Sequence, residues 1–183
     1  MPPFTFPPMH DFPPFFTLQP NPESRARQIQ LWSELITRYC EDKQNLYIEP
    51  QEWLVRGELF SNEKIKRSVS PQLLNAIFDE LARQGRLEWV DSTPSSSSPA
   101  GAANRARAVI WYRTPDEWAV KMHEWCRATS KVGQVCTLGD FKESEAFQPL
   151  DSFAALRCYE AAKRLGRADY FVRGGEAAVK FMP

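Results

Sequence analysis

The sequence predicts an α+β protein in which two small domains, each of helices and a hairpin, follow an extended N-terminal tail. Three observations support this prediction. Eight of the 15 prolines lie within the first 22 residues. In the rest of the chain, apolar residues recur every three or four positions, the spacing of one face of a helix. The chain also holds a diverged internal repeat, and its 183 residues are enough for two small domains.

The tail, residues 1–22, reads MPPFTFPPMHDFPPFFTLQPNP. Proline lacks a backbone N–H and keeps its predecessor out of the α region, so this stretch cannot form an α-helix. We expect an extended chain close to polyproline II. Phenylalanines are interleaved with the prolines at positions 4, 6, 12, 15 and 16, which is unusual for a purely solvated tail.

We assign residues 23–113 to the first domain. An amphipathic helix is predicted for 23–41, a short strand for 46–48 and short helical pieces for 53–66. Ser70 and Pro71 are a helix start, with Ser as the N-cap and Pro at the first position, and Gly85 ends that helix.

A hairpin closes this domain, with predicted strands at 86–91 and 108–112. The stretch 92–107 between them is rich in Ser, Pro, Ala and Gly, which predicts a flexible insertion at the tip of the hairpin.

We assign residues 114–183 to the second domain. Thr114 is a predicted N-cap, followed by Pro115 and the acidic Asp116 in the first helical turn. A short strand at 135–138, a short helix and a longer helix at 152–165 come next. The last element is a hairpin whose strands flank Gly174 and Gly175, residues that readily take the positive φ angles of a two-residue turn.

The two domains share a sequence pattern. WSELITRYC (Trp32–Cys40) aligns with WAVKMHEWC (Trp118–Cys126), and IFDELARQGRLEWV (Ile77–Val90) aligns with CYEAAKRLGRADYF (Cys158–Phe171). The matched core positions are Trp32 with Trp118, Ile36 with Met122, Tyr39 with Trp125, Cys40 with Cys126 and Phe78 with Tyr159. Each half then reads helix, strand, helix, helix, hairpin. This order predicts two tandem winged-helix domains.

Catalytic, cofactor and metal chemistry is not expected. The chain has no glycine-rich phosphate loop and no G-x-S-x-G elbow. His10 lies in the tail and His123 lies alone on a predicted helix, so neither is a convincing general base. The four cysteines form no C-x-x-C pair, which predicts reduced thiols in a cytosolic protein rather than a zinc site. No apolar stretch reaches the ~20 residues that span a bilayer, and no secretory signal is recognisable.

The strongest candidate for function is FPPFF, residues Phe12, Pro13, Pro14, Phe15 and Phe16. Prolines limit the entropy lost on docking, and adjacent phenylalanines offer anchors for apolar pockets. No P-x-x-P occurs for an SH3 domain, and PPFF lacks the tyrosine of a WW ligand. The alternative is that the tail folds back and covers its own first domain. Covering this domain and docking on a partner can coexist.

FPPFFTLQPN (Phe12–Asn21), followed by a helix with Trp32 and Cys40, resembles the vacuolar protein sorting-associated protein 25 family, the small subunit of the ESCRT-II complex. The resemblance continues through LARQGRLEWVD, TPDEW and the C-terminal VKF. It implies two winged-helix domains in a non-enzymatic subunit. It also implies that two copies dock through the Pro–Phe motif on the two larger ESCRT-II subunits.

The resemblance further implies that the second domain recruits the initiating ESCRT-III subunit at endosomes, for sorting of ubiquitinated cargo into multivesicular bodies. We assign that contact to the second hairpin, with Tyr170 and Phe171. Such a protein would be cytoplasmic and would reach endosomal membranes only through its partners. The 92–107 insertion and the extra Pro-Phe stretch near the N-terminus depart from the family pattern.

The main alternative is a winged-helix protein that binds nucleic acid. Its recognition helix would be basic on the exposed side, and residues 152–165 carry Arg157, Lys163 and Arg164 against Glu160. The formal net charge of zero argues against duplex binding. An SH3- or WW-domain ligand is a second alternative.

Overall fold

The computed structural model describes residues 3–90 and 107–183. It divides into two compact units, Met1–Tyr112 and Arg113–Pro183. Of the predicted flexible insertion at 92–107, every residue except Arg107 lies outside the described part of the chain.

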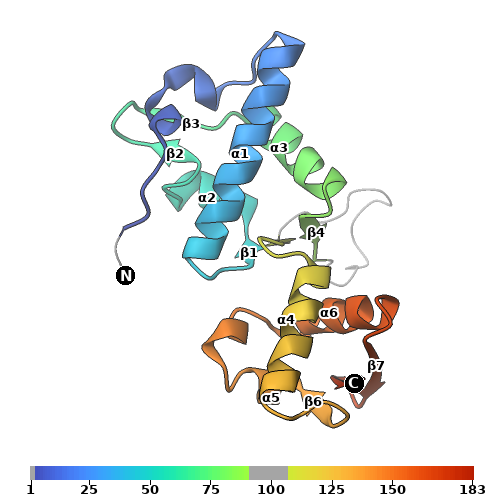
Figure 1. The fold of residues 1–183 in the computed structure, drawn as a ribbon. Coiled ribbons are helices and arrows are strands. Elements are labelled where there is room, and N and C mark those ends of the chain that lie inside the picture. The colour runs from blue at the N-terminus through green and yellow to red at the C-terminus, as the bar shows by residue number, and fades with distance from the viewer. Residues whose placement is uncertain (1–2, 91–106) are drawn as a thin grey trace, which may run out of the picture. The chain divides into compact units, whose positions relative to one another are not determined.

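Among its described residues, unit 1 contains three α-helices and two small antiparallel sheets. Figure 1 shows how they are arranged. In chain order its elements are η1 (Pro8–Asp11), η2 (Pro13–Phe16), α1 (Pro22–Asp42), β1 (Tyr47–Ile48), α2 (Pro50–Arg56), β2 (Ser61–Asn62), β3 (Arg67–Ser68), α3 (Pro71–Arg83), β4 (Leu87–Trp89) and β5 (Ala108–Ile110). The main sheet has the order β1-β5-β4, and β2 pairs with β3. Prolines open α1 and α3, and the side chains of Asn21 and Ser70 cap them as the sequence predicts for Ser70.

One local prediction is wrong. The stretch 53–66 was expected to be helical, but the helix α2 ends at Arg56 and the chain then forms the β2–β3 hairpin. The turn places Lys66 at φ 51°, and the strands are only two residues long. A strand of that length has no periodicity that a sequence pattern can detect.

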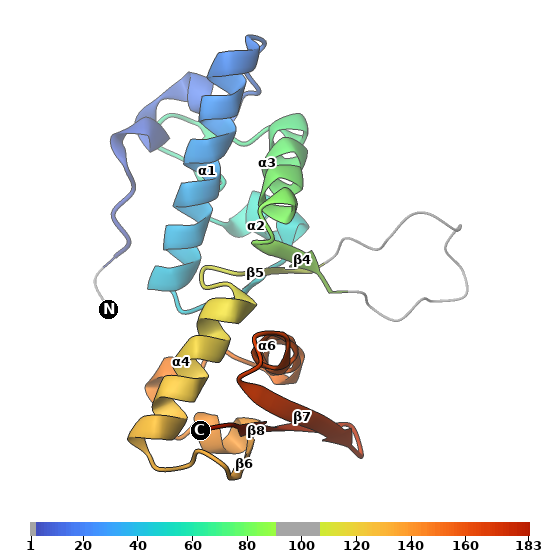
Figure 2. The same cartoon turned by 45° about the vertical axis from the view of Figure 1, so that its right-hand side comes forward.

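Unit 2 repeats this arrangement with one sheet (Figure 2). Its elements are α4 (Pro115–Ala128), β6 (Val135–Thr137), α5 (Leu138–Phe141), η3 (Glu145–Phe147), α6 (Ser152–Arg164), β7 (Ala168–Arg173) and β8 (Glu176–Phe181). Thr114 and Glu117 form a capping box at the start of α4. Gly174 and Gly175 have φ angles of 61° and 86°, so the predicted two-residue turn between β7 and β8 is confirmed.

The repeat seen in the sequence is present in the topology. The sheet orders β1-β5-β4 and β6-β8-β7 are equivalent, because in each unit the last strand lies in the middle and pairs with the first. This topology fits the winged-helix arrangement that the sequence predicts. Equivalent backbone positions are also left-handed: Gln44 and Ser130 follow the first helix of each unit at φ 50° and 56°, and Gly85 and Gly166 follow the last helix at φ 68° and 67°.

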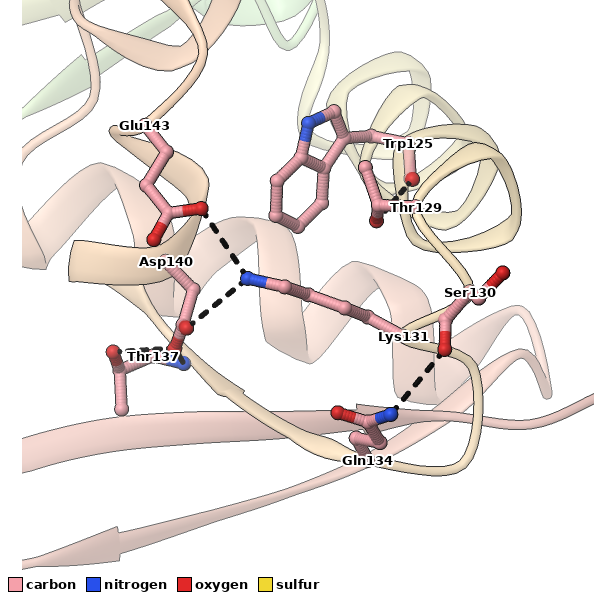
Figure 3. A network of polar contacts seen from close by, with 8 residues as sticks. All are labelled: Trp125, Thr129, Ser130, Lys131, Gln134, Thr137, Asp140 and Glu143. Carbon is pink, nitrogen blue, oxygen red and sulfur yellow. Dashed lines mark hydrogen bonds and ion pairs between the residues drawn. The ribbon is translucent and has the colours of Figure 1, made fainter.

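A polar network joins the end of α4 to α5 in unit 2 (Figure 3). The Lys131 Nζ lies 3.3 Å from Asp140 Oδ1 and 3.4 Å from Glu143 Oε2, and 4.9 Å from the centre of the Trp125 ring. The Thr137 backbone N–H donates to Asp140 and, together with the Thr137 hydroxyl and Lys131, lowers the pKa of that carboxyl. The network thus links the segment after α4 to α5 within unit 2.

The four cysteines are buried free thiols. Burial raises the pKa of Cys40 to about 12, and it acts in the same direction on Cys126, Cys136 and Cys158, so these groups stay protonated near neutral pH. Across residues 3–90 and 107–183, no three His, Cys, Asp or Glu side chains are arranged to hold a metal ion. None of the helices in this part of the chain is both long and apolar enough to cross a bilayer.

Candidate partner-binding site

The Pro–Phe tail is built from two single-turn 3-10 helices, η1 and η2, which lie alongside α1 (Figures 1 and 2). Proline opens each turn, because its fixed φ suits a 3-10 turn and its missing N–H has no partner to lose there. The backbone is extended at Pro7, Phe12 and Thr17, which flank the turns. The expected extended conformation is therefore found at these flanking residues and not in the turns themselves, so the tail is more compact than predicted.

The C-terminal side of the motif is buried in unit 1. The Phe15 ring stacks on the Trp32 ring with centres 4.5 Å apart and planes 7° apart. The Trp32 indole N–H donates to the Phe15 carbonyl oxygen at 2.9 Å. Phe16 is 0% exposed and meets Trp32 edge-on at 5.6 Å. The Phe16 carbonyl accepts the Ser70 N–H at 3.0 Å, so the tail also contacts the start of α3.

The side chain of Gln28, on α1, holds the tail backbone in place. Its amide nitrogen donates to the carbonyl oxygens of Phe15 and Thr17 at 2.9 Å each, and to that of Pro14 at 3.2 Å. Its amide oxygen accepts the Gln19 N–H. Gln28 is itself buried, so these tail groups satisfy a polar side chain that would otherwise be costly to bury.

The N-terminal side of the motif is held by His10 and Asn62. His10 Nε2 is 3.0 Å from the Leu59 carbonyl oxygen. The Asn62 amide donates to the His10 carbonyl oxygen at 2.7 Å, and the Asp11 carboxylate pairs with Lys64 at 2.6 Å. The tail is thus fastened to the segment around β2 as well as to α1.

The five predicted docking residues therefore divide into two groups. Phe12 is 59% exposed and lies with the exposed Pro13 and Pro14 on the outer side of the tail. Phe15 and Phe16, at 6% and 0% exposed, face inward. The alternative in which the tail covers its own first domain describes this arrangement, and it leaves an outward ridge of Phe12, Pro13 and Pro14.

Gln28, His10 and Asn62 were not identified from the sequence as parts of this site. The sequence does indicate that Gln28 faces the core, because it lies four residues before Trp32 and so on the same face of the helix. His10 was considered only as a catalytic base. Nothing in the sequence around Asn62 indicates that it contacts a residue 52 positions earlier.

The second predicted site lies on the β7–β8 hairpin. Tyr170 pairs with Val179, which is buried, and the Lys163 ammonium lies 5.7 Å from the centre of the Tyr170 ring. Phe171 is the next residue along the strand, so its side chain points to the opposite face of the sheet, and it is 47% exposed. The structure therefore does not bring the two aromatic residues onto one surface.

The basic residues of α6, the equivalent of a recognition helix, are all paired with carboxylates. Arg157 pairs with Glu160 at 3.1 Å and Lys163 with Asp169 at 3.6 Å, while Arg164 pairs with Asp116. These charges are therefore partly neutralised within unit 2. This arrangement weakens the nucleic-acid alternative, because phosphate binding relies on available cationic side chains.

Comparisons with known proteins agree on one family. The family model of the ESCRT-II complex subunit matches residues 9–156. The vacuolar protein-sorting-associated protein 25 of Xenopus laevis is 34% identical, with 97% of this chain and 98% of that protein covered. The Homo sapiens protein of the same name is 31% identical, with 97% of both chains covered.

Two solved structures are similar over nearly the whole chain. One is the crystal structure of subunit VPS25 of the endosomal trafficking complex ESCRT-II, with a TM-score of 0.78 and 27% identity over 95% of this chain and 97% of that one. The other is a chain of the endosomal complex ESCRT-II (VPS22/VPS25/VPS36), with a TM-score of 0.79 and 26% identity over 96% and 98% of the two chains.

Proposed function

This chain belongs to the vacuolar protein-sorting-associated protein 25 family of ESCRT-II complex subunits, and we propose that it is a non-enzymatic assembly subunit. It docks on the two larger ESCRT-II subunits and recruits the initiating ESCRT-III subunit, so that ubiquitinated cargo is sorted into multivesicular bodies. The observation that carries the proposal is the match of both sequence and fold over nearly the entire chain.

In this proposal residues 1–22 are the docking tail, 23–113 the first winged-helix domain and 114–183 the second. Two copies serve each complex, one on each larger subunit. The protein is cytoplasmic and is recruited peripherally to endosomal membranes by its partners. The neutral net charge and the paired basic residues of α6 fit a role in protein contacts rather than in nucleic-acid binding.

The docking motif comprises Phe12, Pro13, Pro14, Phe15 and Phe16, with separate tasks for its two sides. The exposed ridge of Phe12, Pro13 and Pro14 enters an apolar pocket of the partner, while the buried Phe15 and Phe16 fix the ridge on unit 1. Burying Phe12 contributes about 1.5–3 kcal/mol. Since association costs about 4–15 kcal/mol, the surface of unit 1 beside the ridge must share the interface.

The contact with ESCRT-III is assigned to the β7–β8 hairpin, with Phe171 on the exposed sheet face and Tyr170 on the other. An exposed phenylalanine on a short wing is a suitable anchor for a partner segment. Phe171 is therefore the residue of this pair that a partner can reach without rearrangement of the sheet.

Two matched variants test the proposal. Phe12→Ala and Phe171→Ala each remove one exposed phenylalanine, so both should fold normally. We expect Phe12→Ala to lose co-elution with the two larger ESCRT-II subunits in size-exclusion chromatography, and Phe171→Ala to keep it. In recruitment of the initiating ESCRT-III subunit to bead-bound complex, Phe171→Ala should fail.

Each variant is the control for the other. If the wild-type chain does not co-elute with the larger subunits, the assembly role is wrong. If the wild type assembles but both variants behave like it in both assays, the role stands and the two assigned surfaces are wrong.

A further inference from the structure

His10 is a buried imidazole whose two nitrogens have fixed and opposite roles. The residue is 4% exposed, and its ring stacks on that of Phe6 with centres 4.2 Å apart. Because the Leu59 carbonyl oxygen can only accept, Nε2 at 3.0 Å from it must carry the proton. Nδ1 is then unprotonated, and the amide nitrogen of Asn62 lies 3.4 Å from it.

A 180° rotation of the Asn62 side-chain amide would break its other hydrogen bonds. Its nitrogen also donates to the His10 carbonyl oxygen at 2.7 Å and to Asp11 Oδ1 at 3.0 Å. Its oxygen accepts the Lys64 N–H at 3.0 Å. The two amide hydrogens are directed to the closer His10 carbonyl oxygen and Asp11 Oδ1, so a second proton on His10 would place an N–H on Nδ1 against the Asn62 amide nitrogen, which accepts no hydrogen bond.

The charges around His10 come from η1 and from the segment that leads into and past β2. The carboxylates of Asp11 and Glu58 favour the protonated ring, and the Lys64 ammonium is paired with Asp11. Glu63 lines the same hollow, while α1 and η2 present the uncharged rings of Trp32 and Phe16. Burial outweighs the carboxylates and lowers the pKa of His10 below its ordinary 6.5.

We propose that neutral His10 is a pH-sensitive clasp that holds the turn η1 on the Leu59–Asn62 segment and releases it when the imidazole binds a proton. Because the closed state lowers the pKa of His10, the unfolded or opened state binds the proton more readily. The closed state is therefore favoured above about pH 6.5 and becomes less stable as the pH falls below that value. The clasp acts in the free chain and so goes beyond the proposed assembly role. One consequence does rest on that role: when η1 opens, Phe12 is no longer held from its N-terminal side, and docking through Phe12 should weaken.

NMR titration of the wild-type chain is the first test. The sequence has only two histidines, so His10 and His123 give two ring signals that the variant His123→Gln assigns. We expect His10 to titrate below 6.5. Titration of His10 at or above this value would overturn the clasp, whatever any variant does.

Hydrogen exchange of the free chain is the second test. The Phe12 N–H closes η1 by donating to Met9, and the Thr17 N–H closes η2 by donating to Pro14, so Thr17 is an internal control. After correction for intrinsic rates, Phe12 protection should fall from pH 7.5 to 5.5, because the opened state binds a proton at His10 more readily, while Thr17 protection falls less. The variant His10→Gln keeps a donor for Leu59 but cannot titrate, so it should lose this pH dependence. Equal pH dependence in the variant and the wild type would refute the clasp.

Binding to the larger ESCRT-II subunits separates this inference from the proposed function. The wild type should bind more weakly at pH 5.5 than at pH 7.5, and His10→Gln should bind equally at both. If the wild type never binds, the assembly role fails, while the two measurements on the free chain still decide the clasp.

Discussion

The first helix of each unit carries a buried tryptophan, and the two units cover it differently. Trp32 and Trp118 each have a phenylalanine 6.0 Å away, Phe60 in unit 1 and Phe147 in unit 2. In unit 1 the tail residue Phe15 stacks on Trp32. In unit 2 the Lys121 ammonium lies 5.2 Å from the centre of the Trp118 ring and the Arg113 guanidinium 5.8 Å from it.

The next aromatic position of the repeat shows the same contrast. Tyr39 meets the tail residue Phe4 edge-on at 5.1 Å and also has Lys43 at 5.5 Å, while Trp125 is covered by Lys131 at 4.9 Å. The two units thus cover the equivalent aromatic residues of their first helices with different groups. Unit 1 takes in an N-terminal segment as part of its core, whereas in unit 2 the equivalent residues have cations and rings of the unit itself beside them.

The largest expected effect comes from removing a tail phenylalanine that is part of this core. Phe16→Ala should lower the free energy of unfolding of unit 1 by about 3–5 kcal/mol, because it leaves a cavity beside Trp32. Phe12→Ala, in the same tail but exposed, should change it by less than about 0.5 kcal/mol. Urea unfolding with segment-resolved hydrogen exchange would measure both, and equal losses would remove the distinction between the two sides of the motif.

A smaller loss is expected from the polar contact between α1 and the tail. Gln28→Ala removes one of the donors to the Phe15 and Thr17 carbonyls, which keep the Trp32 indole and the Gln19 side-chain amide respectively, and should lower the stability of unit 1 by about 1–3 kcal/mol. Gln30→Ala is the matched control, since Gln30 is exposed on the same helix and bonds only to Glu34 and Arg27 among the described contacts. If the two variants unfold at the same urea concentration, Gln28 does not hold the tail.

The repeat itself predicts a matched pair of losses. Gly85→Ala and Gly166→Ala each place a side chain at a left-handed position after the last helix of a unit, and each should cost about 1–2 kcal/mol. Gly139→Ala, where the added Cβ meets only Thr137 Oγ1 at an ordinary 3.5 Å, should cost much less. Thermal unfolding would show this, and a large difference between Gly85→Ala and Gly166→Ala would argue against equivalent backbones.

The smallest effect concerns the cations of unit 2. Lys131→Gln removes the partner of Asp140 and Glu143 and the cation beside Trp125, and should lower Tm by less than Gly166→Ala does. The loss should shrink in 1 M salt, because salt screens partly exposed charges. A loss that does not depend on salt would mean that Lys131 acts through packing alone.

Local patterns were enough to predict most helices and the repeat. The helix expected at 23–41 is α1, Pro22–Asp42, and the aligned Trp32 and Trp118 are both buried. Patterns of this kind depend on neighbours three or four residues apart. The β2–β3 hairpin and the inward orientation of Phe15 depend on contacts with residues far along the chain, such as Ser70 with Phe16. Such contacts leave no periodic trace in the sequence.

The site shows the same limit. FPPFF was recognisable as a contact motif from its composition, but its division into an exposed ridge and a buried side was not. The pairing of Tyr170 with Val179 and of Phe171 with Ala178 decides which hairpin residue is reachable, and register is a tertiary property. Whether either site binds the assigned partner remains a prediction.

The tail belongs to the core of unit 1, and hydrogen exchange of the Trp32 indole proton is the sharpest check of this packing. This N–H donates to the carbonyl oxygen of Phe15 in the buried interface between tail and helix. In the full chain without partners at pH 7.5, its hydrogen exchange should be as slow as that of the most protected α1 amides, because both require unit 1 to open. Exchange at the rate of an exposed indole would contradict this packing and would indicate that the tail is a free docking segment.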